Sequence, residues 1–234
     1  MISINAYYDF LLQFMIATWS VAITALLYSG YIFLNKSRKT EVESQKWLFI
    51  GIGIFLILYG ITRILFLCAE WARDWGADLY SPNVIPFSKP GGSGYDFFWR
   101  LAALIGLVGL IIYNFVVERY LIRKTKYVFS IIGVGTLIVC VIFGPYDIGL
   151  LATRTGPLIM GFSIVILYIY LIFTGEGEVR KKAIIATLGL FVFFLGVGLD
   201  STTGQALFMN LFPARDITAF FVIAGLIIFH KAYE

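Results

Sequence analysis

The sequence predicts an all-α integral membrane protein: a bundle of seven transmembrane helices with the N-terminus outside and the C-terminus in the cytoplasm. Three observations predict this class: an apolar composition, seven long apolar runs, and a concentration of Lys and Arg in alternate loops. Of the 234 residues, 60% are hydrophobic and 14% are charged, whereas a soluble domain carries about 25% charged residues. An apolar excess of this size cannot be hidden in one soluble core, so it must face lipid.

The apolar runs set the predicted spans, and together they make one transmembrane domain over residues 1–234 with no soluble domain. They lie at about 7–34, 47–71, 97–117, 127–145, 157–174, 183–208 and 216–231. A span needs roughly 17–20 residues to cross about 30 Å of hydrocarbon at 1.5 Å per residue. Long runs without strict alternation predict helices rather than barrel strands.

The first run is too long for the apolar segment of a cleaved signal peptide, which has about 7–15 residues, and no basic segment precedes it. We therefore expect it to be the first span. The last run is the shortest of the seven.

Orientation follows from the basic residues of the short loops, which concentrate on the cytoplasmic side of membrane proteins. Twelve of the 18 Lys and Arg residues lie in the odd-numbered loops and the tail, and four lie in the even-numbered loops. The odd loops are therefore predicted to be cytoplasmic, in a multi-pass protein of the cell membrane. The twelve are Lys36, Arg38, Lys39, Lys46, Arg119, Arg123, Lys124, Lys126, Arg180, Lys181, Lys182 and Lys231; the four are Arg73, Lys89, Arg154 and Arg215.

The loop at 72–96 is longer than the others and is predicted to be external. It is either a lid over an outward-facing pocket or simply a long connector. Its Gly91–Gly94 segment lacks the Gly-Lys-Ser/Thr ending of a phosphate-binding loop, so no nucleotide site is expected.

Catalytic and metal-binding motifs are missing from the sequence. His230 is the single histidine, and no Gly-x-Ser-x-Gly or His-Glu-x-x-His motif occurs. We therefore expect no enzyme activity, no metal and no cofactor. The small net charge of +4 gives no reason to expect nucleic acid as a partner.

Three ionisable residues fall inside predicted spans, where charge is costly and usually functional. Arg63 lies 16 residues beyond Trp47, or about 24 Å along a helix. Asp200 lies 17 residues beyond Ala183, or about 26 Å along its helix. Arg100 lies near the outer end of the third span, so all three are predicted to share one layer near the outer surface.

An α-helix turns by 100° per residue, so the sequence shows which other residues share a helical face with Arg63, Arg100 and Asp200. The glycines on the sixth helix would let another helix approach closely. The sequence thus predicts a polar cluster between the second, third and sixth helices. The faces are Tyr59, Arg63 and Glu70 on the second helix; Arg100, Asn114 and Glu118, with Asp96 above, on the third; and Gly189, Gly196, Asp200 and Thr203 on the sixth.

Three interpretations of this cluster remain open. In the first, Asp200 pairs with Arg63 or Arg100, Asp96 or Glu70 satisfies the other arginine, and the cluster only fixes helix packing. In the second, the two guanidiniums bind a carboxylate or phosphate of a ligand, because Arg offers a planar bidentate fork. In the third, Asp200 and Glu70 titrate along a proton or ion pathway.

Known seven-helix classes fit the sequence poorly. A retinal-binding rhodopsin needs a lysine in the middle of its seventh helix. In this sequence the seventh predicted span has one lysine, Lys231, and it lies at the end of the span. Glu118-Arg119-Tyr120 resembles a motif of G-protein-coupled receptors, but the other receptor motifs are missing.

The sequence also contains a possible internal repeat. Residues 41–63 align without gaps on 178–200, and 109–113 resemble 225–229. This pattern suggests a parallel repeat with the fourth helix as linker, as in some transporters.

The leading functional prediction is binding or transport of a small polar solute, with anions included, at an outward-facing charged site. The alternative is a receptor-like sensory module that signals to a separate cytoplasmic protein, with the lipid bilayer as a partner in every case. A transporter should continue its polar residues inward from the cluster, whereas a sensor should have a closed inner half. Asn114 and Glu118 continue the stripe of the third helix inward, which favours transport slightly.

Overall fold

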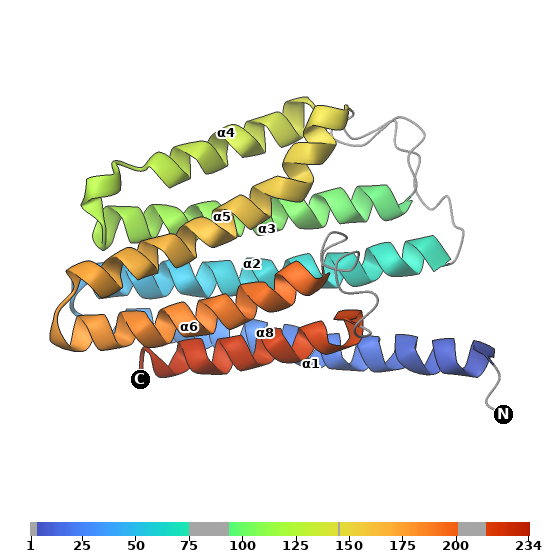
Figure 1. Ribbon diagram of the computed structural model, residues 1–234, viewed down its shortest axis with the longest axis horizontal. Coiled ribbons are helices and arrows are strands. Elements are labelled where there is room, and N and C mark those ends of the chain that lie inside the picture. The colour runs from blue at the N-terminus through green and yellow to red at the C-terminus, as the bar shows by residue number, and fades with distance from the viewer. Residues whose placement is uncertain (1–3, 75–93, 145, 201–213) are drawn as a thin grey trace. The chain divides into compact units, whose positions relative to one another are not determined.

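A computed structural model describes residues 4–74, 94–144, 146–200 and 214–234, and within these residues all the regular secondary structure is helical (Figure 1). The α-helices are α1 (Ile4–Lys39), α2 (Glu43–Asp74), α3 (Gly94–Tyr120), α4 (Val128–Ile142), α5 (Asp147–Thr174), α6 (Gly177–Asp200) and α8 (Ala214–Lys231), with a 3-10 turn at Arg123–Thr125. The helices form two units, Leu26–Ile164 and Met1–Ala25 with Val165–Glu234, whose relative placement is not determined.

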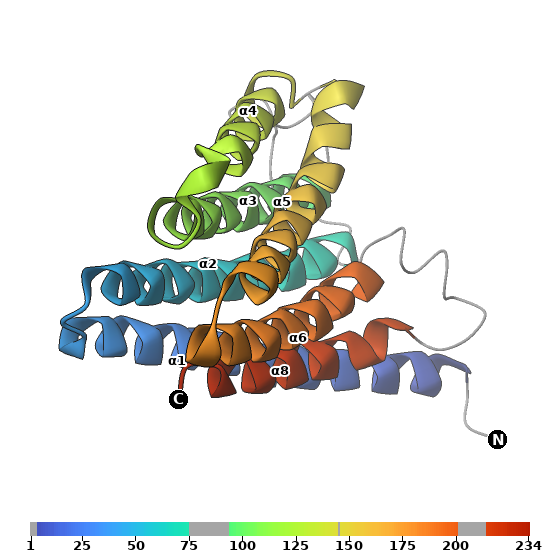
Figure 2. The same cartoon turned by 60° about the vertical axis from the view of Figure 1, so that its left-hand side comes forward.

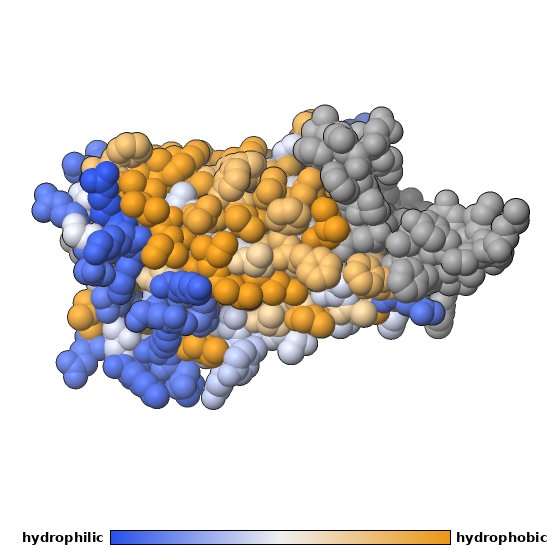
Figure 3. Space-filling model, turned by 60° about the horizontal axis from the view of Figure 1, so that its bottom comes forward, coloured by the Kyte–Doolittle hydropathy of each residue, from blue (hydrophilic) through white to orange (hydrophobic). Residues whose placement is uncertain are grey.

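Five of the described helices are long and apolar enough to cross a membrane. Each offers 24 to 29 residues of high mean hydropathy, in α1, α2, α3, α5 and α6, whereas α4 and α8 are shorter apolar helices. Their outward surfaces carry large apolar side chains such as Ile131, Phe162 and Phe173. On the face drawn in Figure 3, hydrophobic residues cover the middle of the helices and hydrophilic residues gather at one end. An apolar surface of this kind is expected in lipid rather than in water.

In the unit Leu26–Ile164, α1, α2 and α3 pack as antiparallel neighbours, and Figure 2 again draws α2 beside α3. Gly51 of α2 lies against Val116, and Thr62 of α2 lies against Gly106, so residue numbers rise in opposite directions along the two helices. The α1–α2 contact brings Gly30 and Gly53 together. A Cβ on either glycine would lie 2.9 Å from the carbonyl oxygen of the other.

Helices α4 and α5 complete this unit. Gly133 of α4 faces both Ile111 of α3 and Met160 of α5, and Gly156 of α5 faces Leu107. α4 is therefore antiparallel to α3, while α5 runs parallel to it. The α1–α2 and α3–α4 connections consequently lie at the same end of the unit.

In the other unit, α6 and α8 are packed backbone against backbone. A Cβ on Gly225 would lie 2.4 Å from the Phe193 nitrogen and 2.7 Å from the Gly189 oxygen. Farther along α6, Gly196 faces Thr218 and Val222, so the two helices are antiparallel. Close approach through Gly189 and Gly196 confirms the role predicted for these glycines.

Helix α5 begins at Asp147, ten residues before the apolar run at 157–174. Pro157 lies inside the helix, although proline removes a backbone donor and usually marks a helix start. Membrane helices tolerate an internal proline because packing against neighbouring helices and local adjustment satisfy the freed backbone groups. Arg154, which the loop count placed outside the spans, therefore belongs to a helix.

Candidate functional site

Arg63 is buried on α2 among aromatic groups, with 4% of its surface exposed. Its Nε donates to the Tyr59 hydroxyl at 2.9 Å, and Nη2 donates to the same oxygen. The guanidinium also lies 5.0 Å from the Tyr59 ring centre and 5.4 Å from that of Phe66. Aromatic faces stabilise a guanidinium through cation–π attraction, which strengthens when water is excluded. Tyr59 and Arg63 therefore lie on one face of α2, as their spacing in the sequence indicates.

The aromatic contacts continue from α2 to α3 and α5. The rings of Phe66 and Trp99 are 6.5 Å apart, and the Arg154 guanidinium lies 5.9 Å from the Trp99 ring centre. We call Tyr59, Arg63, Phe66, Trp99 and Arg154 the arginine–aromatic cluster. It joins three helices of one unit and contains two guanidiniums, one buried and one exposed.

Sequence analysis missed Trp99 and Arg154. Trp99 lies within the predicted third span but carries no charge, and Arg154 precedes the apolar run at 157–174 and so falls in a predicted loop. Thr153, Arg154 and Thr155 are consecutive, so they show no helical spacing from which this position could have been predicted.

Arg100 lies on α3 outside this cluster, and it is 2% exposed. Its Nε forms an ion pair with Asp96 Oδ2 at 2.8 Å, one helical turn away; Asp96 was one of the partners considered in the first interpretation of the cluster. Its Nη1 donates to the carbonyl of Gly144, just beyond the end of α4. Carbonyls at a helix end lack intrahelical donors and carry partial negative charge, so a guanidinium is a favourable partner.

Glu118 performs the opposite task at the other end of α4, where it is 1% exposed. Its carboxylate accepts from the backbone N–H of Phe129 at 3.1 Å and of Ser130 at 2.9 Å, and from the Ser130 hydroxyl. Tyr127, the N-cap residue, has a left-handed backbone (φ 63°) and gives no side-chain cap. The carboxylate of α3 therefore satisfies the first free donors of α4.

Asn114 is fully buried and joins α3 to α5. Its Nδ2 donates to the carbonyls of Leu110 at 3.0 Å and Met160 at 3.1 Å, and its Oδ1 accepts from the Ser163 hydroxyl at 2.8 Å. Amides that bind across membrane helices in this way stabilise packing. Ser163 was not singled out from the sequence because it is one hydroxyl within a long apolar run.

The remaining predicted site residues have different outcomes. Asp200 is half-buried at the last position of α6, in a different unit from Arg63 and Arg100, so its predicted pairing stays a prediction. Glu70 lies half-buried on α2. Thr203 and most of the predicted lid at 72–96 lie outside the described residues.

The class that fold and composition define is an all-α protein whose several long apolar helices indicate a polytopic membrane protein. Comparison with known proteins found no family model, no curated protein and no solved structure that matches the chain.

Proposed function

We propose that this protein is a seven-span membrane protein that binds a small anionic solute at the arginine–aromatic cluster and acts as a receptor-like sensory module. The N-terminus lies outside in this proposal, and the basic α1–α2 and α3–α4 connections face the cytoplasm. The cluster then lies toward the outer ends of α2, α3 and α5. Two guanidiniums beside flat aromatic faces suit a ligand with a carboxylate or phosphate.

The observation that favours sensing over transport is the state of the polar stripe on α3. A transporter needs polar groups that can be exposed along a route through the membrane. Asn114 and Glu118, the residues that continue the stripe inward, are buried at 0% and 1% exposure. Their polar atoms are occupied by Met160, Ser163 and the start of α4. Because these polar groups already form hydrogen bonds between helices, they support a bundle whose cytoplasmic half is closed, as a sensor requires.

The experiment pairs ligand binding with flux on the same purified protein. Thermal stability in detergent would be measured against small carboxylates, phosphate, amines and neutral solutes. A ligand that binds only the folded state raises stability by RT ln(1 + [L]/Kd). We expect an anion to stabilise the wild type, and Arg154→Gln to lose that shift. Arg180→Gln removes an exposed charge far from the cluster along the chain and should keep it.

Flux of the stabilising anion would then be measured in proteoliposomes. Stabilisation without flux supports the sensor, and stabilisation with saturable flux overturns it in favour of a transporter. Absence of stabilisation by any solute would leave the cluster a packing element only. Each variant is compared with its own ligand-free melting point, so a loss of stability in Arg154→Gln does not obscure the result.

Transport remains a second candidate because one observation favours a repeated architecture. The proposed repeat aligns α2 with α6 and α3 with α8, and in each half the two helices pack against each other, α2 against α3 and α6 against α8. Gly109 faces Phe55 and Leu58 of α2, and its aligned counterpart Gly225 faces Gly189 and Phe193 of α6. Both glycines thus meet the preceding helix at nearly equivalent heights. Parallel repeats of three helices are known in transporters.

A further inference from the structure

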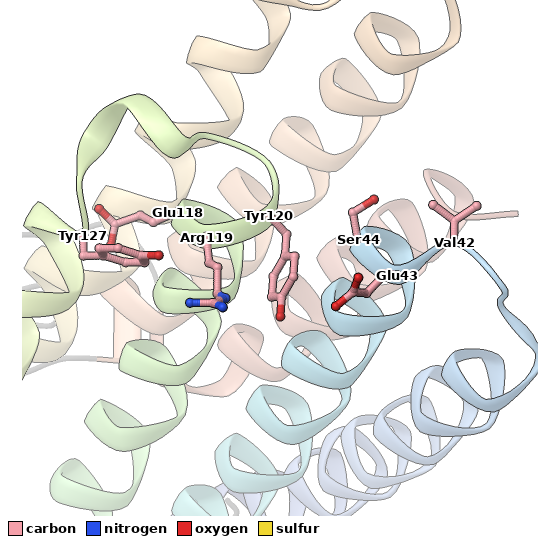
Figure 4. A pocket seen from close by; sticks show the side chains of 7 residues that line it. All are labelled: Val42, Glu43, Ser44, Glu118, Arg119, Tyr120 and Tyr127. Carbon is pink, nitrogen blue, oxygen red and sulfur yellow. The ribbon is translucent and has the colours of Figure 1, made fainter.

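A groove of about 670 Å³ opens at the end of the unit Leu26–Ile164 where α2 begins and α3 ends (Figure 4). Residues 42–44 line one side, and Arg119, Tyr120 and Tyr127 line the other. Its volume lies in the range of roughly 300–1,000 Å³ common for small-molecule sites. The groove is separate from the arginine–aromatic cluster, and neither of the functions proposed above uses it.

Arg119 is the exposed cation of this groove, and it stands between two tyrosines. Its guanidinium lies 5.6 Å from the ring centre of Tyr120, and Figure 4 places Tyr127 on its other side. Tyr120 is itself stacked on Trp47 of α2, with ring centres 5.9 Å apart and planes 8° apart. Tyr and Trp gather at the headgroup level of membrane proteins because their rings are apolar and their tips are polar.

The charge around the groove is positive. Four exposed lysines lie at this end of the unit: Lys39 at the end of α1, Lys46 in the first turn of α2, and Lys124 and Lys126 in the α3–α4 connection. Basic pockets at the cytoplasmic ends of membrane helices attract anionic headgroups, because the inner leaflet is negatively charged. Arg119 provides a planar fork that matches two phosphate oxygens.

An apolar surface runs from the groove along the outside of α3 and α4. Tyr127 stacks on Phe115, with ring centres 5.5 Å apart, and both side chains are exposed. Val128 and Ile131 continue the exposed apolar surface along α4. A molecule with a phosphate at Arg119 could therefore lay hydrocarbon against this surface, which a soluble phosphate could not use.

We propose that the groove binds the phosphate headgroup of an anionic phospholipid, with Arg119 as the phosphate ligand and Tyr120 and Tyr127 as its flanking walls. Acyl chains then lie along Phe115 and Ile131. The assignment depends on insertion in a membrane, and it holds whether the protein is a sensor or a transporter.

The two carboxylates of the groove are compatible with this assignment. Glu118 is buried and its charge faces the amino end of α4. Glu43 lies across the Tyr120 ring from Arg119 in Figure 4, away from the phosphate position. The Glu43 carboxylate still repels an anion weakly, so replacing it with a neutral glutamine should increase binding of an anionic lipid.

The test is lipid retention measured by native mass spectrometry on the full chain. The protein would be purified from mixed vesicles of phosphatidylglycerol and phosphatidylcholine. We expect the wild type to retain phosphatidylglycerol preferentially. Arg119→Gln should lower that preference roughly fivefold, since a basic residue at an anionic surface contributes about that much. Arg38→Gln removes an exposed charge from the same end of the unit without touching the groove and is the matched control.

Two further arms identify the ligand. Glu43→Gln should raise retention of phosphatidylglycerol, which a variant that merely unfolds could not do. Glycerol phosphate and inorganic phosphate should leave the melting point nearly unchanged where phosphatidylglycerol raises it. Equal losses in Arg119→Gln and Arg38→Gln would overturn the site in favour of diffuse charge attraction. An equal shift with soluble phosphate would overturn the lipid assignment, and so would an undiminished preference in Arg119→Gln.

Discussion

Arg100 and Glu118 lie on the same helix, α3, and bind the two opposite ends of α4. The guanidinium meets the carbonyl end, where the helix dipole is negative, and the carboxylate meets the amide end, where it is positive. Helix α4 has 15 residues, or about 22 Å of length, which is short of the roughly 30 Å hydrocarbon layer. Both charges are thus placed where a short helix leaves its terminal polar groups within or near lipid.

Replacing Glu118 should loosen the start of α4. Glu118→Ala leaves two backbone donors and the Ser130 hydroxyl without their acceptor, so we expect a loss of about 2–3 kcal/mol. Glu118→Gln keeps an acceptor and should lose less. The measurement is thermal unfolding in detergent, with hydrogen exchange at residues 128–131 reporting the local effect. Glu178→Gln, which breaks an exposed pair with Lys181, is the control and should change stability by less than about 0.5 kcal/mol. Unchanged exchange in Glu118→Ala would contradict the capping role.

Arg100→Gln should destabilise the opposite end of α4 and remove the guanidinium that pairs with Asp96. Removal of one partner from a buried pair costs about 3–5 kcal/mol. The Asp96 side chain is 27% exposed, so water screens this pair, and we expect a loss near or below the lower end of that range. Asp96→Asn in the same background should recover part of the loss, giving a measurable coupling in a double-mutant cycle of unfolding free energies. Additive losses would show that the two side chains act independently.

The polar stripe of α3 could be predicted from the sequence, but the partners of its residues could not. Helical spacing put Asp96, Arg100, Asn114 and Glu118 on one side of α3, and all of them are buried or half-buried. Several of their partners are backbone groups, such as the Ser130 N–H at the start of α4, the Met160 carbonyl of α5 and the Gly144 carbonyl beyond α4. Every residue carries such groups, so the sequence gives no signal for which of them will be free.

The start of α5 shows a different limit of sequence analysis. Gly156 and Pro157 normally mark a helix boundary, because proline has no backbone donor. Packing against α3 and α4 overrides that local preference: Gly156 lies against Leu107 and Thr136, and α5 continues through the proline.

The pairing predicted between Asp200 and an arginine stays a prediction. A double-mutant cycle of Asp200→Asn with Arg63→Gln, measured in unfolding free energy, would test it.

The α6–α8 contact should be sensitive to one added carbon. Gly225→Ala would put a Cβ 2.4 Å from the Phe193 nitrogen, and because that atom is backbone, one helix must move. Overpacking of this kind costs about 1–3 kcal/mol. Gly198→Ala on α6 is the matched control, since a Cβ there meets no described atom within 4 Å. It should be neutral or stabilising by up to about 1 kcal/mol through helix propensity. Equal melting points for the two variants would contradict the close approach.

Substitution of Asn114 distinguishes most clearly whether the polar stripe of α3 serves helix packing or solute transport. Its amide binds the Met160 carbonyl and the Ser163 hydroxyl across the α3–α5 contact. We expect Asn114→Ala to destabilise by about 1–2 kcal/mol, the range found for hydrogen bonds between membrane helices in model peptides. Ser163→Ala should lose less, because the Asn114 amide keeps its bond to Met160.

The two substitutions should be coupled in unfolding free energy, whereas Asn114→Ala and Thr155→Ala should be additive. Thr155 is the appropriate control because its hydroxyl bonds within α5, to the Leu151 carbonyl, on the exposed side of the helix. A packing residue should leave the anion-induced melting shift intact. If Asn114→Ala kept wild-type stability but changed the solute selectivity of flux in proteoliposomes, the stripe of α3 would be a solute route, and the sensor proposal would give way to the transporter.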